Sequence, residues 1–141
     1  EYDIFSEDAA GEWSMASNVR HGNVLILTNL PSYRPVGIAI LMRDWDEPGR
    51  CYLCDFGVEE GYRGRGLGTY FLRVVLDEVR LMNLESMSLT VDVNNEAAIG
   101  LYRKFGFEII DKRGDVYGQG RHRYFTDLEI APAVPTESQS S

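Results

Sequence analysis

The residues whose types and spacing most clearly suggest a binding site form one short segment, residues 61–70. They read GYRGRGLGTY and contain four glycines and two arginines. The loop lies between an apolar run, CYLCDFGV, and a run with helical periodicity, LGTYFLRVVLDEVRLM. A glycine-rich loop between a strand and a helix exposes backbone N–H groups beside the positive end of the helix, where phosphate binds readily. The segment therefore predicts a phosphate-binding loop. The alternative is a turn whose glycines only satisfy the backbone geometry.

Two common phosphate loops can be tested by the spacing of the glycines. Gly61 and Gly66 have the separation of a P-loop, but Leu67 occupies the position of the required lysine. Gly64 and Gly66 begin the dinucleotide fingerprint, but Thr69 stands where the third glycine belongs. These mismatches argue against a nucleotide-binding protein. The glycines instead alternate with other residues, which predicts an anion nest of successive N–H groups at the start of the helix.

A second block lies downstream, in residues 95–107, which read NEAAIGLYRKFGF. Together the two blocks resemble the GNAT superfamily of N-acetyltransferases. The loop of that family has Arg or Gln, two residues, Gly, one residue, then Gly or Ala, which Arg63, Gly66 and Gly68 match. The second family block has Asn, two residues, Ala, two residues, Leu-Tyr and a following Gly-Phe, as residues 95–107 do. The resemblance covers roughly residues 23–130 and concerns the fold and the cofactor rather than the acceptor.

The resemblance implies acetyl-CoA as the acetyl donor. The CoA pyrophosphate would lie on the backbone N–H groups of residues 63–69, and the pantetheine arm would run beside the strand before the loop. Residues 54–58 and 89–93 would form a parallel pair that splays apart and exposes edge groups to an amide-bearing ligand. The cofactor-binding residues implied in this way are Phe56, Gly57, Val58, Arg63, Gly64, Arg65, Gly66, Leu67, Gly68, Thr69 and Asn95.

Acetyl transfer from a thioester to an amine needs a neutral amine, a donor for the thioester oxygen as it gains charge, and a proton for the leaving thiolate. The family tyrosine that often reaches the CoA sulfur corresponds to Tyr102. We predict Tyr102 as the general acid, because a phenol is protonated at pH 7. The alternative is a core aromatic residue at the end of a short helix. The oxyanion donor would be the backbone N–H of Gly57 or Val58.

The general base departs from the family pattern. Some relatives carry a catalytic Glu early in the strand before the loop, near Tyr52 here, and ribosomal-type relatives carry one on the next strand, near Thr90. Neither residue is a carboxylate. Asp92 shares the face of Thr90 and is the predicted base, while Asp55 lies next to the expected thioester. Each of these carboxylates could instead be structural, with a chain of waters acting as the base.

Two cysteines, Cys51 and Cys54, have a CxxC spacing that invites a metal or redox interpretation. They lie in a predicted strand, where residues three apart point to opposite faces. No second CxxC or histidine pair completes a metal site, so we predict buried free thiols, no metal and a reducing cytoplasm. His21 and His122 have no partner at metal-ligand spacing, which predicts surface histidines.

Two segments bear on the acceptor. The resemblance implies that residues 115–121, DVYGQGR, help to shape its pocket, so that Tyr117 and Arg121 either contact the substrate or belong to a plain turn. Relatives usually begin with a strand and two helices that cover the acceptor site, whereas only 22 residues precede Asn23. That part could be missing, supplied by another chain, or reduced.

The elements that must position these residues follow from hydrophobic periodicity. Residues 23–30 and 35–45 predict two strands in an antiparallel pair, and the near-continuous apolar run 51–58 predicts a strand buried on both faces. A weaker pattern suggests a helix over residues 7–19, with Ser6 as its N-cap.

The second half of the chain has a stronger pattern. Apolar residues at i, i+4 and i+8 predict a helix over residues 67–82, and a β-rich run at 86–93 predicts the next strand. Strand, helix and strand in this order make a right-handed crossover between parallel strands. The remaining expected elements are a helix over 95–105, capped by Asn94 or Asn95 and ended by Gly106, and strands over 107–113 and 121–130.

The length of 141 residues fits a single domain over residues 1–130, followed by a disordered tail over 131–141 that is rich in Pro, Ser and Thr. The formal net charge of −8 argues against binding to nucleic acid or anionic membranes and mildly favours cationic substrates. No apolar run approaches the ~20 residues of a membrane span, and the N-terminus has no signal-peptide core. A cytoplasmic protein is therefore expected.

These observations combine into one prediction. The fold is α/β (α+β), with a mixed central sheet that has antiparallel N-terminal strands and a splayed parallel pair. The function is that of an N-acetyltransferase, which moves an acetyl group from acetyl-CoA to a primary amine of a small molecule, protein or peptide. A homodimer is left open. The alternative is a non-catalytic GNAT-fold module that binds acyl-CoA as a sensor or partner domain.

Overall fold

The structure is a computed structural model that describes residues 13–18, 23–30, 32–64, 66–114 and 122–130. It divides into two compact units. The first, here called the N-terminal unit, comprises Glu1–Met42 and Leu53–Val79. The second, called the C-terminal unit, comprises Arg43–Tyr52 and Arg80–Ser141. Two strands and one helix pass from one unit into the other.

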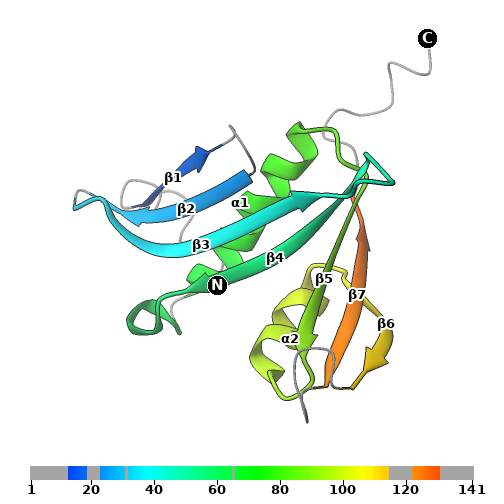
Figure 1. The fold of residues 1–141 in the computed structure, drawn as a ribbon. Helices are drawn as coiled ribbons and strands as arrows, with labels where there is room; N and C mark the ends of the chain where they lie inside the picture. Colours follow the sequence, from blue (N-terminus) through cyan, green and yellow to red (C-terminus); the bar gives the residue numbers. More distant parts are fainter. Residues whose placement is uncertain (1–12, 19–22, 31, 65, 115–121, 131–141) are drawn as a thin grey trace. The chain divides into compact units, whose positions relative to one another are not determined.

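Four strands follow one another in the hydrogen-bonded order β1-β2-β3-β4 in the N-terminal unit. Their bounds are β1 (Trp13–Asn18), β2 (Asn23–Asn29), β3 (Arg34–Arg43) and β4 (Arg50–Val58). β1 and β3 both pair with β2 in the antiparallel sense (Figure 1), which confirms the predicted pair at residues 23–30 and 35–45. The β2–β3 register shifts between Leu27 and Thr28, so this part of the ladder contains a bulge.

The predicted helix over residues 7–19 is wrong where the structure describes it. Trp13–Asn18 form strand β1, whose residues pair in register from Trp13↔Asn29 to Asn18↔Val24. The helical pattern in this segment was weak, whereas the edge of β2 offers a row of backbone partners. Pairing with that edge satisfies the N–H and C=O groups of a short segment better than an isolated helix of similar length.

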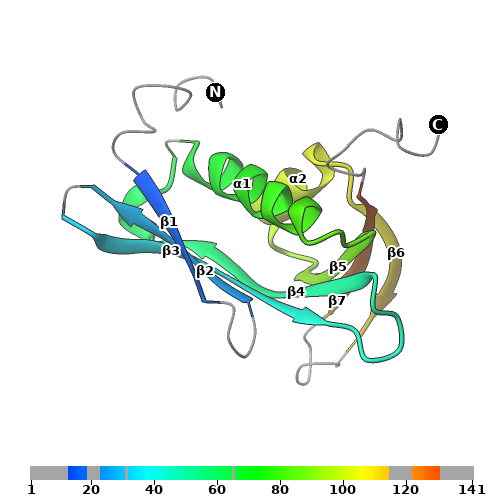
Figure 2. The ribbon, with the colours of Figure 1, turned by 90° about the horizontal axis from the view of Figure 1, so that it is seen from above.

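A single helix, α1 (Leu67–Leu81), covers one face of the sheet in the N-terminal unit (Figure 2). Its buried residues recur at helical spacing, as predicted: Leu67, Phe71, Leu72, Val75, Leu76 and Val79. They face buried side chains of the strands, among them Leu25, Leu27, Ala39 and Leu41. Gly37 lies directly under the helix, because a Cβ atom at Gly37 would stand 3.1 Å from the Phe71 ring.

The C-terminal unit has the strand order β4-β5-β7-β6 and one helix. Its elements are β5 (Ser86–Asp92), α2 (Glu96–Lys104), β6 (Glu108–Arg113) and β7 (Arg123–Glu129). β4 and β5 are parallel, and the register runs only from Arg50↔Ser86 to Tyr52↔Ser88. β7 is antiparallel to both β5 and β6. The mixed sheet and the crossover between parallel strands were both predicted.

The sheet of the C-terminal unit buries one face with α2, which lies beside β5 in Figure 1. Met87, Leu89 and Val91 alternate along β5 and are almost fully buried. Asn95 caps α2, since its side-chain oxygen accepts a hydrogen bond from the N–H of Ala98 at 3.1 Å. Gly106 follows the helix with φ of +102°, as predicted for a C-terminal glycine.

None of the helices in the described segments has the length and apolar character needed to cross a bilayer.

Candidate functional site

The connection from β4 to α1 contains the predicted phosphate loop. After β4 the chain makes one turn of 3-10 helix, Glu60–Tyr62, and then extends at Arg63. Backbone bonds hold this turn, because Tyr62 N–H donates to Glu59 C=O at 2.8 Å and Arg63 N–H to Glu60 C=O at 3.1 Å. The loop is therefore built by its own backbone before the helix begins at Leu67.

The loop requires glycine at two positions. Gly64 and Gly66 have φ values of +79° and +78°. A residue with a side chain adopts this region only at a cost of roughly 1–2 kcal/mol. A Cβ atom at Gly64 would meet no other atom within 4 Å. The requirement at Gly64 is therefore conformational, and the space beside its backbone is open.

The start of α1 presents backbone donors with a positive electrostatic potential. The N–H of Tyr70 donates to Gly66 C=O at 3.0 Å, so the helix offers no carbonyl to the N–H groups of Leu67 and Gly68. The first turn of α1 contains no acidic side chain that would neutralise the helix dipole. Leu67 is only 1% exposed, so its side chain belongs to the core and only its backbone can face a ligand. These features fit an anion.

Arg63 ties the loop to the end of β4. Its Nε donates to the carbonyl oxygen of Val58 at 3.0 Å. This bond restrains the exposed Arg63 side chain next to the loop. Arg65, the other predicted cation, lies outside the described residues.

The last residues of β4 differ in what they present. The Phe56 ring stacks on Phe71 of α1 with 5.2 Å between centroids, so the partly exposed Phe56 is held against the helix. Glu59 N–H donates to Val36 C=O of β3 at 2.7 Å. Since N–H groups alternate along a strand, Gly57 also directs its N–H toward β3, and Val58 directs its N–H to the other edge. Of the two predicted oxyanion donors, only Val58 points away from β3.

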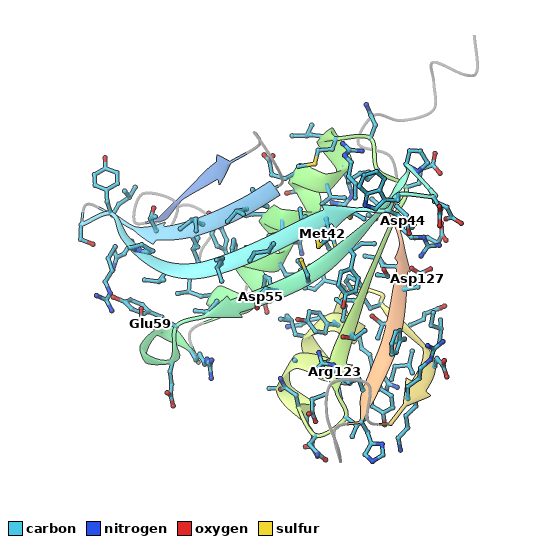
Figure 3. The ribbon with its side chains drawn as sticks, in the orientation of Figure 1. Met42, Asp44, Asp55, Glu59, Arg123 and Asp127 are labelled. Atoms are coloured by element: carbon cyan, nitrogen blue, oxygen red, sulfur yellow. The ribbon has the colours of Figure 1, made fainter. Side chains whose placement is uncertain are left out.

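A shallow pocket of about 350 Å³ lies between the ends of β3 and β4. It is lined by Pro35, Val36, Gly37, Ile38, Gly57, Val58 and Glu59. A Cβ atom at Gly57 would meet nothing within 4 Å, so the absence of a side chain there keeps the pocket open. Glu59, labelled in Figure 3, pairs with Arg34 at 2.7 Å at the rim.

The predicted acid and base both lie in the C-terminal unit. Tyr102 is on α2, is 9% exposed and packs edge-on against Phe107 with 5.6 Å between ring centroids. Asp92 ends β5 and is partly buried, and its Oδ1 accepts a hydrogen bond from Asn94 N–H at 2.8 Å. One oxygen of Asp92 is thus engaged in a turn. The catalytic roles of Tyr102 and Asp92 stay predictions.

The structure adds a polar cluster that sequence reasoning missed. Arg123 of β7 donates from Nε to Thr90 Oγ1 at 3.1 Å and from Nη2 to Thr90 C=O at 3.0 Å. Tyr52 OH lies 3.4 Å from the same Thr90 oxygen. Sequence reasoning had singled out Tyr52 and Thr90 only as positions without a carboxylate. The register of β5 with β7 joins them to Arg123, and no local pattern carries that information.

The two cysteines are both free, but only one is buried. Burial raises the pKa of the Cys51 thiol to about 11. Cys54 is exposed, and its Sγ donates to Ile40 C=O at 3.3 Å, so the predicted burial of Cys54 is wrong. The physical reason is that β4 exposes Cys54 and Asp55 in succession instead of burying both faces.

His122 is exposed, as expected, and its ring lies against Gly114, where a Cβ atom would approach to 2.7 Å. His21, Tyr117 and Arg121 lie outside the described residues.

The chain is similar to known proteins in sequence and in fold. Residues 2–107 match the sequence pattern of the Acetyltransferase (GNAT) family. The chain belongs to that family. An L-methionine sulfoximine/L-methionine sulfone acetyltransferase of Pseudomonas aeruginosa is 32% identical over 78 residues, which cover 53% of this chain and 45% of that protein.

Two further proteins are similar to this chain. The N-alpha-acetyltransferase 50 of Danio rerio is 38% identical over 69 residues, covering 48% of this chain and 41% of that protein. A GNAT family acetyltransferase from Elizabethkingia anophelis, solved with acetyl-CoA bound, has a TM-score of 0.73 and 12% identity over 84% of this chain and 98% of its own. That likeness concerns the fold. The chain matches less than half the length of these two curated GNAT relatives.

Proposed function

We propose that this GNAT chain is an N-acetyltransferase, which transfers an acetyl group from acetyl-CoA to a primary amine. The observation that carries the proposal is the loop before α1. Gly64 and Gly66 hold it in a conformation that other residues avoid, and it delivers the N–H groups of Leu67 and Gly68 at a helix start without acidic side chains. A pyrophosphate matches such a site in charge and in hydrogen-bond demand.

Several groups of the chain are proposed to bind CoA. The N–H groups of Gly64, Gly66, Leu67 and Gly68 would receive the pyrophosphate, while Arg63, held at Val58, would add positive charge. The edge of β4 away from β3 carries the N–H and C=O groups of Phe56, which would bind a pantetheine amide as an added strand does. Thr69 and Asn95 complete the proposed CoA contacts.

The chemistry would be divided among a few groups of this chain. The Val58 N–H would donate to the thioester oxygen as that oxygen gains negative charge. Tyr102 would donate its phenolic proton to the leaving thiolate, and Asp92 would take the proton from the acceptor ammonium or amine. Holding the amine close to the thioester would supply much of the rate.

The acceptor is proposed as a primary amine of a small molecule or of a protein. The named relatives include an acetyltransferase of amino-acid analogues and an N-alpha-acetyltransferase, and both classes of acceptor offer a primary amine. A second candidate function is that of a non-catalytic acyl-CoA sensor. The observation in its favour is that the two strand positions where relatives carry a catalytic Glu hold Tyr52 and Thr90.

One pair of measurements distinguishes the enzyme from the sensor. The protein is incubated with acetyl-CoA and a panel of amino acids, polyamines and peptide N-termini, while the release of free CoA thiol is followed with a thiol reagent. Binding of CoA is measured separately by titration calorimetry. An enzyme binds CoA and releases thiol only with an acceptor. A sensor binds CoA without amine-dependent release, and a protein that does not bind CoA at all contradicts both functions.

A further inference from the structure

The sheet of the N-terminal unit has a second face, opposite to α1. Gly37 of β3 lies under the Phe71 ring of α1, and Phe56 of β4 stacks on the same ring. Because successive residues of a strand point to opposite faces, Ile38 and Gly57 face away from α1. We call this side of the sheet the open face, since α1 covers the other side in the described part of the unit (Figure 2).

The open face is apolar on β2 and β3. Its residues there form two register pairs, Val24↔Ile40 and Ile26↔Ile38. All four side chains are partly exposed, unlike the buried residues that alternate with them under α1. An uncovered apolar surface of this kind can gain free energy from contact with an apolar group of a ligand.

β4 adds acidic residues to the open face. Asp55 and Glu59 flank Gly57 at a spacing of two, so all three point to the same side, whereas Val58 between them is buried. Glu59 pairs with Arg34 at 2.7 Å. Among the residues that the structure describes, no side chain pairs with the exposed Asp55. Asp55, labelled in Figure 3, thus keeps a negative charge that a cationic ligand can offset.

The pocket of about 350 Å³ at the ends of β3 and β4 opens on this face, because Ile38 and Gly57 line it. Pro35 and Val36 add further apolar lining, and a Cβ atom at Gly57 would meet nothing within 4 Å. The volume is at the lower end of the ~300–1,000 Å³ typical of small-molecule sites, so it suits one short apolar group. Asp55 stands two residues from Gly57, which corresponds to roughly 7 Å along a strand.

We propose that the open face binds the acceptor, with its ammonium group at the Asp55 carboxylate and an attached apolar group in the pocket at Gly57. The substrate class is then a primary amine that carries a short apolar substituent. This inference rests on the proposed acetyltransferase function and specifies its acceptor. Val58 joins the two sides of the reaction, because it lines the pocket and its N–H is the proposed oxyanion donor. The ammonium must lose a proton before transfer, for which Asp92 remains the proposed base.

The charge of the whole chain agrees with a cationic acceptor. The net charge of −8 attracts ammonium ions toward the protein, and Asp55 supplies a carboxylate at which one of them can bind. A carboxylate and an ammonium form a charge-assisted hydrogen bond, which is stronger than a bond between neutral groups. The proposal therefore needs both the apolar pocket and the unpaired acid, and each can be tested separately.

The test of the pocket compares glycinamide with leucinamide as acceptors in the thiol-release assay. The two ammonium groups have similar pKa values, so the comparison reports the isobutyl group. The wild-type kcat/KM should be roughly 10-fold higher for leucinamide, because the shallow pocket covers part of that group. Equal use of the two amides by the wild-type protein would overturn the assignment.

Two isoleucines of β3 form a matched pair of variants for the pocket. Ile38→Ala removes part of the pocket wall and should lose most of the preference for leucinamide. Ile40→Ala makes the same change on the same strand and face, outside the pocket lining, and should keep the preference. Urea unfolding shows that both variants are folded. An equal loss of preference in both would contradict the proposal.

Two aspartates form the matched pair for the charge. Asp55→Asn should raise KM for both amides roughly 5- to 20-fold with little change in kcat, because a charge-assisted contact at an exposed site is lost. Asp46→Asn removes the same charge from another exposed position, on the turn between β3 and β4, and should leave KM unchanged. An unchanged KM in Asp55→Asn, or an equal rise in both variants, would refute the role of Asp55.

A second readout separates this inference from the proposed function. Should no amine support thiol release, the acetyltransferase proposal fails, and binding of the two amides is then measured by NMR titration in the presence of CoA. Tighter binding of leucinamide that is weakened in Asp55→Asn and Ile38→Ala, but not in their controls, still supports the acceptor site. Absence of binding, or equal binding of the two amides, refutes it. A change of oligomeric state in Ile38→Ala with unchanged amide binding would assign the open face to contact between copies of the chain and overturn the proposal.

Discussion

Gly64 allows the phosphate-binding role of the loop to be tested separately from its folding. Gly64 has φ of +79°, and a Cβ atom there would meet nothing within 4 Å. Gly64→Ala therefore pays only the conformational cost of a side chain at positive φ, roughly 1–2 kcal/mol. The conformational cost of Gly64→Asp is no larger, since Asp tolerates this region better than most residues. The Asp variant also adds a negative charge to the loop.

The difference between the two variants isolates the charge. A carboxylate about 5 Å from a phosphate oxygen repels it by about 3 kcal/mol at an effective dielectric constant of ~20, and by less than ~1 kcal/mol in bulk water. The loop is exposed at Gly64, so a value of about 1–3 kcal/mol is expected. CoA should therefore bind to the Asp variant roughly 5- to 150-fold more weakly than to the Ala variant.

Calorimetric titration with CoA at low salt and at 1 M salt measures this difference. Urea unfolding of both variants provides the control for stability. Because the Debye length falls from ~10 Å at 0.1 M salt to ~3 Å at 1 M, the gap between the two affinities should shrink at high salt. The reasoning is refuted if the Ala and Asp variants, equally folded, bind CoA with the same affinity at low salt.

Four further outcomes are expected. Tyr102→Phe keeps the ring but removes the phenolic proton, so turnover should fall roughly 10²–10⁴-fold while CoA affinity changes little. Turnover at the wild-type rate would show that Tyr102 serves only in packing. Gly37→Ala should lower the free energy of unfolding, measured in urea, by roughly 1–3 kcal/mol, because its Cβ would stand 3.1 Å from a buried ring. Gly57→Ala should cost less, because its Cβ would meet nothing within 4 Å. Equal losses in the two variants would contradict this packing. Alkylation at pH 8 should modify the exposed Cys54 and spare Cys51, whose pKa of about 11 keeps it protonated. Equal labelling of both thiols in the native protein would contradict this assignment. Because burial raises the pKa of Cys51 in the folded state, the folded protein favours the protonated thiol. The contribution of Cys51 to the free energy of unfolding should therefore be full at neutral pH and be lost as pH rises toward 11.

Local sequence patterns were sufficient for much of the fold. The i, i+4, i+8 stripe from Leu67 predicted α1, and the apolar runs at 23–30 and 86–93 predicted β2 and β5. The order strand, helix, strand then implied the parallel pairing that β4 and β5 show. Asn95 and Gly106 were found as the cap and end of α2 from residue type and position alone. Such features depend on residues within a few positions of each other.

Two expectations failed because the deciding interaction is distant in sequence. Trp13–Asn18 become a strand since the edge of β2 supplies backbone partners, which a weak local pattern does not reveal. Cys54 is exposed because β4 does not bury both of its faces along its whole length. A near-continuous apolar run could not show where that burial ends.

The alternating glycines predicted a loop for an anion, and the structure shows Gly64 and Gly66 with φ above zero. Anion binding by this loop stays a prediction. Arg123 is different. Its bonds to Thr90 depend on a register that places β7 beside β5, and Tyr52 approaches the same hydroxyl from β4. These three strands are brought together from positions up to 71 residues apart along the chain, since Tyr52 and Arg123 are numbered 52 and 123. Only tertiary structure assembles a cluster of this kind, because hydrogen bonds between side chains depend on distances in space that residue spacing does not determine.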